Sequence, residues 1–266
     1  MSQTQKVIKY LAIAFAIFLI VSIISGIMFS LSIFTGIFNQ DVLDEMKTFS
    51  IENSKTLKID VKTVNLSVKI DEQFKIETNN KYIEVNESSD KITIKENNFN
   101  WFKNNKSQLI IYIPSNYEFD KIDIDSGAGK IDIESLNTKI LNLDLGAGNI
   151  LIDDLTVSNN IDIDGGAGNI TISNANINNL DLEMGVGNLS LSSYLTGNSK
   201  IDGGVGNIDL NLIGNQDDYK IKIEKGIGKA TIDNNSVSNT TYGNGNNYID
   251  IDCGVGEIVI NFENKL

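Results

Sequence analysis

The chain has 266 residues, a formal net charge of −13, no histidine and one cysteine. A surface this acidic repels nucleic-acid phosphates and anionic lipid headgroups, so nucleic-acid binding is not expected as a function. A histidine-based catalytic triad, a histidine zinc site and an intramolecular disulfide are ruled out by composition.

A transmembrane helix is expected over residues 10–38. From Val7 to Phe38 the only charged residue is Lys9, and this apolar run is longer than the ~20 residues that a helix needs to cross a bilayer. The run also exceeds the apolar region of a cleaved signal peptide, which is typically about 7–15 residues long. We therefore predict an uncleaved anchor at the cell membrane.

The charges on either side of this run predict its orientation. Lysines precede the run and acidic residues follow it, so the positive-inside rule places residues 1–9 in the cytoplasm and the C-terminal part outside the cell. Residues 39–54 are expected to form a linker and residues 55–266 a repeat domain. The prediction is a single-pass protein with an extracellular C-terminal domain.

Repeat-like sequence begins at Leu57–Val68, where Lys62 and Val64 occupy positions that later copies give to glycine. Strand-like runs follow, and the only proline, Pro114, ends the last of them. These runs are Phe74–Thr78, Tyr82–Asn86, Lys91–Lys95 and Leu109–Ile113.

An asparagine-rich segment at residues 97–105 contains Phe99, Trp101 and Phe102. Two interpretations are open for these aromatic rings. They either cap one end of the repeat domain or form an exposed loop that stacks on sugars or contacts a membrane interface.

Seven copies of one pattern follow, each with two short alternating strands that flank a Gly-x-Gly corner. The first glycines of the copies lie 19, 20, 19, 19, 22 and 28 residues apart. A near-constant period of this size is typical of a solenoid, in which each copy forms one rung. The glycines are Gly127, Gly129, Gly146, Gly148, Gly166, Gly168, Gly185, Gly187, Gly204, Gly206, Gly226, Gly228, Gly254 and Gly256.

The predicted fold is all-β, a parallel β-solenoid (β-helix) with rungs of about 20 residues. All copies run in the same sense, so neighbouring rungs should pair in parallel; an antiparallel meander is the less favoured alternative. Apolar residues at alternate positions should then stack inside in two columns. One column is Ile122, Leu141, Ile161 and Leu180, and the other is Ile131, Ile150, Ile170 and Leu189.

The last copy has two features of its own. The longer step before it, across residues 234–248, suggests an insertion that loops out of the stack. Cys253 occupies a repeat position held elsewhere by residues such as Ser126, and we interpret it as a packed side chain rather than a reactive thiol.

An acidic residue lies two positions before each corner, and Asp60 has the same place in the early copy. In a parallel stack these carboxylates form an acid column with neighbours about 4.8 Å apart, and their repulsion must be offset. Either each accepts hydrogen bonds from the N–H groups of its corner, or some bind a cation such as calcium. The residues of this candidate cation site are Asp125, Asp144, Asp164, Glu183, Asp202, Glu224 and Asp252.

Asparagine follows most of the corners, at Asn149, Asn169, Asn188 and Asn207, and Asn65 matches them in the early copy. Asparagine side chains stacked at one repeat position can bond amide to amide along the stack. We expect this asparagine column to stabilise the solenoid rather than to bind a ligand.

The stretch LIIYIPSNYEFDKIDIDSGAGKIDIESL at residues 109–136 resembles a bacterial family of β-strand-repeat proteins labelled "putative adhesins", which includes LiaG-type proteins of envelope-stress operons. The strand that ends in Pro114 and the later Gly-x-Gly rungs match as well, so the resemblance spans roughly residues 50–262. It implies a membrane-anchored β-solenoid on the cell surface, with no catalytic residues and no cofactor. Lys62, Val64 and Lys225 depart from the pattern.

The favoured function is that of a non-enzymatic, membrane-anchored extracellular adhesin or cell-envelope interaction protein, with an envelope protein or a glycan as partner. Two alternatives stay open. The protein could be an accessory or sensor of envelope stress that binds a membrane partner. It could also be a polysaccharide-acting enzyme, although a hydrolase needs two carboxylates in different environments and the acid column repeats one.

Overall fold

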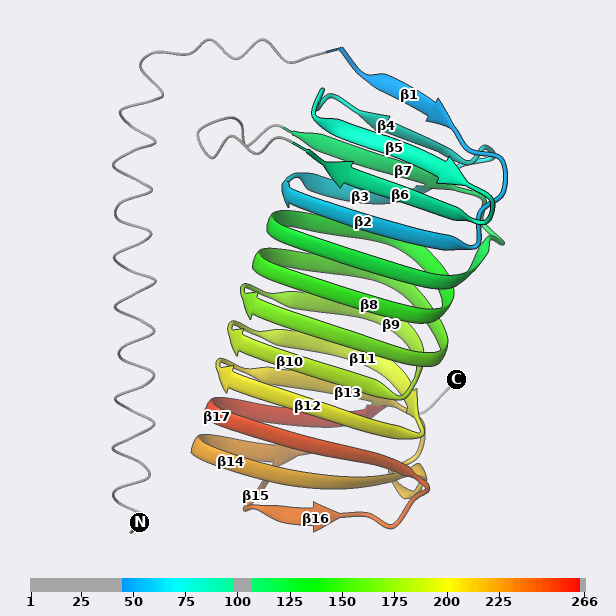
Figure 1. Ribbon diagram of the computed structural model, residues 1–266. Helices are drawn as coiled ribbons and strands as arrows, with labels where there is room; N and C mark the ends of the chain where they lie inside the picture. The colour runs from blue at the N-terminus through cyan, green and yellow to red at the C-terminus, as the bar shows by residue number, and fades with distance from the viewer. Residues whose placement is uncertain (1–44, 98–106, 264–266) are drawn as a thin grey trace, which may run out of the picture. The chain divides into compact units, whose positions relative to one another are not determined.

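The computed structural model describes residues 45–97 and 107–263, which form a parallel β-solenoid (Figure 1). In this part of the chain no helix is long and apolar enough to cross a membrane. The predicted membrane span at 10–38 and the rings of Phe99, Trp101 and Phe102 lie outside the described residues. The all-β prediction is confirmed for the described part.

The middle of the solenoid follows the predicted rung pattern. β8 (Glu118–Ala167) is followed by β9 (Ile170–Asn178), β10 (Leu180–Val186), β11 (Leu189–Thr196), β12 (Asn198–Val205) and β13 (Ile208–Ile213). Strands before the corners pair in parallel with one another, as β10 does with β8 and β12. Strands after the corners do the same, as β11 does with β9 and β13. These pairings confirm the parallel arrangement.

Alternating apolar residues fill the interior, as their spacing predicts. Leu180 pairs with Ile161, Leu189 pairs with Ile170, and both predicted inward columns are buried along their whole length. Burying one such side chain contributes roughly 1.5–3 kcal/mol, and only a stack of several rungs offsets the conformational entropy lost on folding.

At the C-terminal end the rungs do not stack in chain order. β17 (Asn247–Glu263) lies between the rung of β12 and β13 on one side and β14 (Tyr219–Ile232) on the other, and it pairs in parallel with all three strands. Figure 1 shows β17 above β14 in the stack. The last rung of the chain is therefore the second from the end of the solenoid.

The prediction that residues 234–248 form a looped-out insertion is wrong, because most of this segment forms strands at the end of the solenoid. A 3-10 turn (Gln216–Asp218) leads into β14. After β14, the chain forms β15 (Asn235–Val237) and β16 (Thr240–Tyr242), which pair antiparallel with β14 and cover its outer edge. The segment then returns to the level of β17. Covered edges are one way in which β-proteins avoid pairing with other chains.

The N-terminal end has a similar arrangement. The early copy forms β2 (Thr56–Thr63) and β3 (Asn65–Ile70), which lie between β8 and the pair β6 (Lys91–Glu96) and β7 (Gln108–Ile113). Antiparallel strands again finish the sheet.

These finishing strands are β1 (Lys47–Ser50), β4 (Lys75–Thr78) and β5 (Ile83–Ser88). β5 pairs with β6, β4 pairs with β7, and β1 pairs with β4. The four strand-like runs are thus confirmed as β4 to β7, whereas β1 forms within residues that were expected to be a linker.

Candidate functional site

The corner glycines form a column in which the backbones of neighbouring rungs approach closely. The second glycine of each corner has a positive φ, as at Gly187 with +151°, and a Cβ there would collide with the carbonyl oxygen of Gly168 in the next rung. First glycines are constrained as well, because a Cβ on Gly146 would lie 2.6 Å from the carbonyl oxygen of Gly127. Glycine is thus required at both positions.

The same contacts give the order of the corners independently of the strand pairing. A Cβ on Gly256 would meet the carbonyl oxygen of Gly206, and a Cβ on Gly228 would meet that of Gly256. The corner of β17 therefore lies between those of β12 and β14.

A buried carboxylate ends the glycine column at its N-terminal side. Glu96 is 8% exposed, and its Oε2 accepts hydrogen bonds from the backbone N–H of Lys62 at 2.7 Å and of Thr63 at 3.3 Å. Its Oε1 accepts a bond from Nδ2 of Asn80 at 2.9 Å. This corner meets a glutamate side chain rather than another Gly-x-Gly corner, which explains why Lys62 and Val64 replace glycine.

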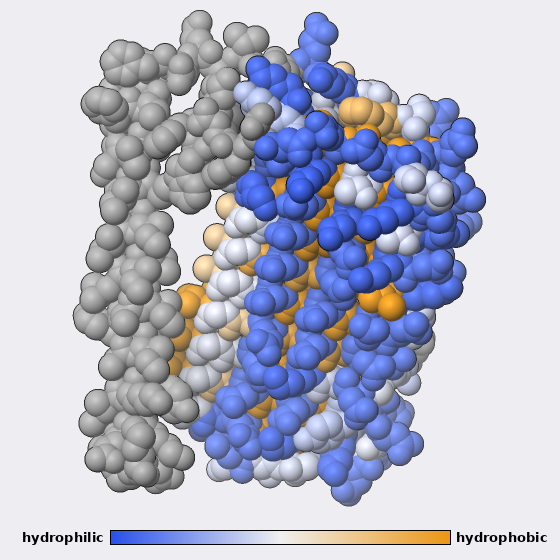
Figure 2. Space-filling model, viewed as in Figure 1, coloured by the Kyte–Doolittle hydropathy of each residue, from blue (hydrophilic) through white to orange (hydrophobic). Residues whose placement is uncertain are grey.

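The acid column forms as predicted, on the outer surface of the strands before the corners. Glu183 pairs in register with Asp164 and Asp202, and Asp252 pairs in register with Asp202 and Glu224. Figure 2 shows hydrophilic side chains in columns that run across the strands on this face. The stack brings all the predicted acids into one row.

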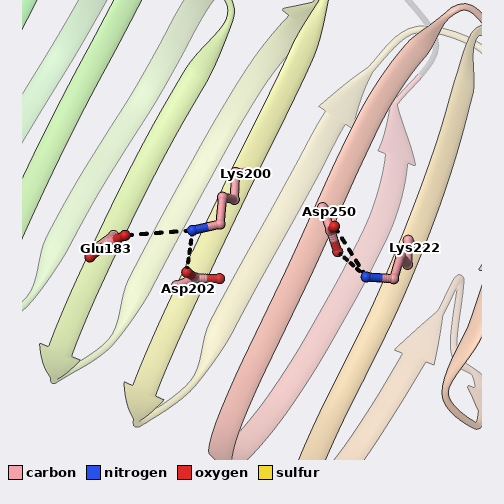
Figure 3. Close-up of polar contacts among 5 residues, drawn as sticks. All are labelled: Glu183, Lys200, Asp202, Lys222 and Asp250. Atoms are coloured by element: carbon pink, nitrogen blue, oxygen red, sulfur yellow. Dashed lines mark hydrogen bonds and ion pairs between the residues drawn. The ribbon is translucent and has the colours of Figure 1, made fainter.

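Lysine side chains, rather than corner N–H groups, bond to three of the seven predicted acids. Lys200 binds Asp202 at 2.6 Å and Glu183 at 3.5 Å (Figure 3). Lys222 binds Glu224 at 3.0 Å. Corner N–H groups donate instead to the next rung, so the predicted bonds to the acids are not found among the described residues.

The corner N–H of Gly187, for example, donates to the carbonyl of Val205 at 2.9 Å.

Nearer the middle of the column, Asp144 and Asp164 form no ion pair within the described ranges. Burial raises the pKa of Asp144, and its neighbours Asp125 and Asp164 raise it further. The repulsion expected from the sequence is therefore present at the middle of the column.

Asp252 experiences the same effects in the displaced last rung. Burial is the largest cause that raises its pKa, and the charges of Asp202 and Glu224 on either side raise it further.

Nowhere in residues 45–97 and 107–263 do three or more Asp, Glu or Cys side chains come together in a group that could hold a metal ion. Cation binding by the acid column stays a prediction.

The asparagine column is confirmed, although its bonds differ from the expected ones. The side-chain oxygen of each asparagine mainly accepts the backbone N–H of the next rung, as from Asn169 to Asn149 at 3.0 Å and from Asn207 to Asn188 at 3.1 Å. One amide-to-amide bond is present, from Asn188 to Asn169 at 3.0 Å. The column therefore holds backbone groups at the corner, which supports its structural interpretation.

Cys253 is packed rather than reactive. It is 1% exposed, its Sγ lies 3.6 Å from the carbonyl oxygen of Gly206, and burial raises the pKa of the thiol. A raised pKa lowers the fraction of nucleophilic thiolate at neutral pH.

A groove of about 490 Å³ crosses four rungs at the start of the strands before the corners, and sequence reasoning did not identify it. Its lining includes Asn160, Asn179, Asn198 and Tyr248, one from each rung. The asparagines recur at a spacing of 19 residues, from which their row along the stack could have been predicted. Tyr248 had no such signal, because it joins this row only through the displaced last rung.

The walls of the groove are fixed by hydrogen bonds between rungs. Asn179 has a left-handed φ of +54°, its Nδ2 donates to the carbonyl of Asn159 at 3.0 Å, and its Oδ1 accepts the N–H of Asn198 at 3.0 Å. The N–H of Tyr248 donates to the carbonyl of Gly197 at 2.9 Å. Hydrogen bonds between neighbouring rungs therefore fix the shape of the groove at the bend in each rung.

Comparison with protein families assigns residues 42–255 to the family described as Toastrack DUF4097. The chain belongs to the toastrack DUF4097 family. The match covers most of the chain and includes every Gly-x-Gly corner except the final glycine, Gly256. The resemblance inferred from the rung pattern is confirmed by this match.

Solved structures similar to this toastrack protein come from bacteria. A putative cell adhesion protein from Clostridium sporogenes has 19% identity and a TM-score of 0.33, over 83% of this chain and 99% of that one. A putative adhesin from Bacteroides fragilis has 15% identity and a TM-score of 0.30, over 81% and 96%. At these values the likeness indicates neither a shared ligand nor a shared activity. No curated protein matches the chain.

Proposed function

We propose that this toastrack protein is a non-enzymatic binding protein of the bacterial cell surface, anchored by residues 10–38 with the solenoid outside the cell. The observation that supports binding most directly is the outer surface of the solenoid. Parallel rungs repeat the same side chains in columns, so the molecule offers an extended surface of regular chemistry. Extended surfaces of this kind suit long or repetitive partners.

The environments of the carboxylates favour binding over hydrolysis. A glycoside hydrolase needs one protonated and one ionised carboxyl group, which requires different surroundings for the two. In the acid column, burial and like-charged neighbours raise the pKa of both Asp144 and Asp252, which lie in equivalent positions of different rungs. Equivalent positions give these groups the same role rather than complementary ones.

Covered ends are consistent with a discrete surface module. Antiparallel strands β1, β4 and β5 finish one end of the solenoid, and β15 and β16 finish the other. Such ends oppose strand-to-strand assembly with other copies and leave the outer faces available for a partner.

The proposal is tested in intact bacteria that express the chain with a C-terminal tag. Protease added outside the cells should remove the tag, and the protein should fractionate with membranes. Isolated cell walls or envelope proteins should retain the full-length chain without any release of soluble sugar. A tag that resists protease only until the cells are lysed would overturn the proposed orientation, and sugar release would indicate an enzyme.

A further inference from the structure

We propose that the groove defined by Asn160, Asn179, Asn198 and Tyr248 binds a polysaccharide strand that carries free amino groups. The inference deepens the proposed function by naming a ligand class. It rests on that function only in requiring the groove to face the outside of the cell.

Two exposed carboxylates lie side by side in the groove. Asp162 and Asp181 line it and pair in register on neighbouring rungs, which lie about 4.8 Å apart. Within the described residues neither forms an ion pair. One ammonium group placed between them could therefore reach both carboxylates and relieve their mutual repulsion.

The lysine nearest to these carboxylates, Lys200, also lines the groove. Lys200 is adjacent to Asp181 in register, but its ammonium group binds Asp202 and Glu183 in the acid column (Figure 3). Asp250, another lining residue, is already bound by Lys222 at 3.2 Å. The hydrogen bond to Asp202 raises the pKa of Lys200 most, and the charge of Asp181 raises it further, so Lys200 and Asp181 do interact. With three aspartates against one lysine, the lining still carries a net negative charge that a cationic ligand would meet.

The remaining lining suits a sugar better than a simple cation. Tyr248 closes one end of the groove with a partly buried ring, and its hydroxyl lies 3.5 Å from Oδ2 of Asp250. The ammonium group of Lys220 lies over one side of this ring, 5.9 Å from its centroid. A sugar would therefore stack on the opposite face of the ring, beside the hydrogen-bonding groups of the groove. The side-chain amides of Asn160 and Asn198 form no hydrogen bond in the described part of the chain, so they can donate to and accept from hydroxyl groups.

Direction and length favour a polymer. The groove runs across four rungs, so it follows the solenoid axis, and its asparagines recur at each of the first three levels. A ligand that repeats along its length meets the same amide chemistry at each step. A β-1,4-linked glucosamine oligomer has the required amino groups, hydroxyl groups and extended shape.

The test is a titration of the full-length chain, purified in detergent, with glucosamine tetramer by isothermal calorimetry. Binding is expected, and it should weaken with added salt because charged groups carry part of the affinity. N-acetylglucosamine tetramer, which lacks the positive charges, should bind about tenfold more weakly. Tetralysine provides the charge without the sugar.

Variants separate the groove from the rest of the acidic surface. Asp162→Asn with Asp181→Asn should weaken binding about tenfold, and Tyr248→Leu should weaken it while Tyr248→Phe keeps it. Asp209→Asn is the matched control, because Asp209 is exposed on a strand after the corner, away from the groove. Circular dichroism melting checks that each variant is folded.

Three results would overturn the inference: no binding of glucosamine tetramer, an equal loss in Asp209→Asn, or tetralysine binding as tightly as the tetramer and unaffected by Tyr248→Leu. The last of these would indicate a site for basic peptides. Retention of the protein by cell walls, combined with a failed titration, would remove this ligand and leave the proposed function intact.

Discussion

The backbone N–H of Glu257 donates to the side-chain oxygen of Asn207 at 3.1 Å, although fifty residues separate the two in the chain. This bond continues the asparagine column from β13 into β17 and passes over β14, which precedes β17 in the sequence. The strand register, the glycine contacts and the asparagine column all have this order. The terminal rung is therefore held on both sides by other rungs.

Engineered disulfides test this order. In a Cys253→Ser background, Asp209→Cys with Val259→Cys should form a disulfide, because these outward-facing residues are register partners. Neighbouring strands lie about 4.8 Å apart, within the Cα separation of 4.4–6.8 Å that a disulfide needs. Mass spectrometry of oxidised, alkylated protein measures the bond.

The matched control for that pair is Asp209→Cys with Thr231→Cys. Thr231 pairs with Val259 rather than with Asp209, so two strand spacings separate the thiols and no disulfide should form. If the rungs stacked in chain order, this control pair would be the one to oxidise.

A single methyl group at the corner should be strongly destabilising. In Gly187→Ala, the new Cβ would collide with the carbonyl oxygen of Gly168 and would force a positive φ on alanine. We expect a loss of about 3–5 kcal/mol in the free energy of unfolding, measured by urea denaturation. Val186→Ala, between the two glycines of the same corner, should cost less than about 1 kcal/mol. Equal losses in the two variants would contradict the close-approach account.

Replacing one side-chain oxygen of the buried Glu96 by an amide nitrogen should destabilise the fold. In Glu96→Gln an amide N–H₂ replaces one acceptor oxygen, while the groups around it, the N–H of Lys62 and Thr63 and Nδ2 of Asn80, are all donors. An unsatisfied donor is expected to destabilise the fold by about 1–3 kcal/mol. Glu84→Gln, on the exposed side of neighbouring β5, is the control and should unfold at the wild-type urea midpoint.

Much of this fold follows from local sequence, but the order of its rungs does not. Alternating apolar residues, such as Ile161 and Ile163, specify strands, and Gly166 with Gly168 specifies a corner at which rungs meet. Since every rung has this pattern, β12 could pair equally well with β14 or with β17. Only the longer step before Gly254 indicated that something differed, and a looped insertion explained it as simply as a crossover did.

The candidate sites were predictable to a different degree. The acid and asparagine columns lie at fixed positions beside the corner, so a parallel stack is enough to assemble them. The hydrogen-bond and ion-pair partners of the acids were not predictable. Asp202 is bound by Lys200 on the same strand, and the corner N–H groups donate to carbonyl groups of the neighbouring rung rather than to the acids. The groove depends on Tyr248 beside Asn198, a contact that exists only in the displaced order.

Removing one charge from the middle of the acid column should stabilise the protein. Asp144 lies between Asp125 and Asp164, and burial together with these neighbours raises its pKa. Each like-charged neighbour about 4.8 Å away contributes about 0.9 kcal/mol of repulsion in water, and salt roughly halves this. Asp144→Asn should thus raise the free energy of unfolding by about 1 kcal/mol at neutral pH. Asp209→Asn, outside the column, should change it far less.

The pH dependence of that gain has a definite sign. A carboxyl group whose pKa is higher in the folded than in the unfolded state binds more protons when folded, so its contribution to stability falls as pH rises from about 4 through the folded pKa. Asp144 and Asp252 both follow this rule. The difference between Asp144→Asn and wild type should therefore be largest at neutral pH and should shrink towards pH 4.

Calcium tests whether the acid column binds cations. If it does, calcium should raise the melting midpoint of the wild type more than that of Asp144→Asn. Equal wild-type midpoints with calcium and with chelator would remove the hypothesis.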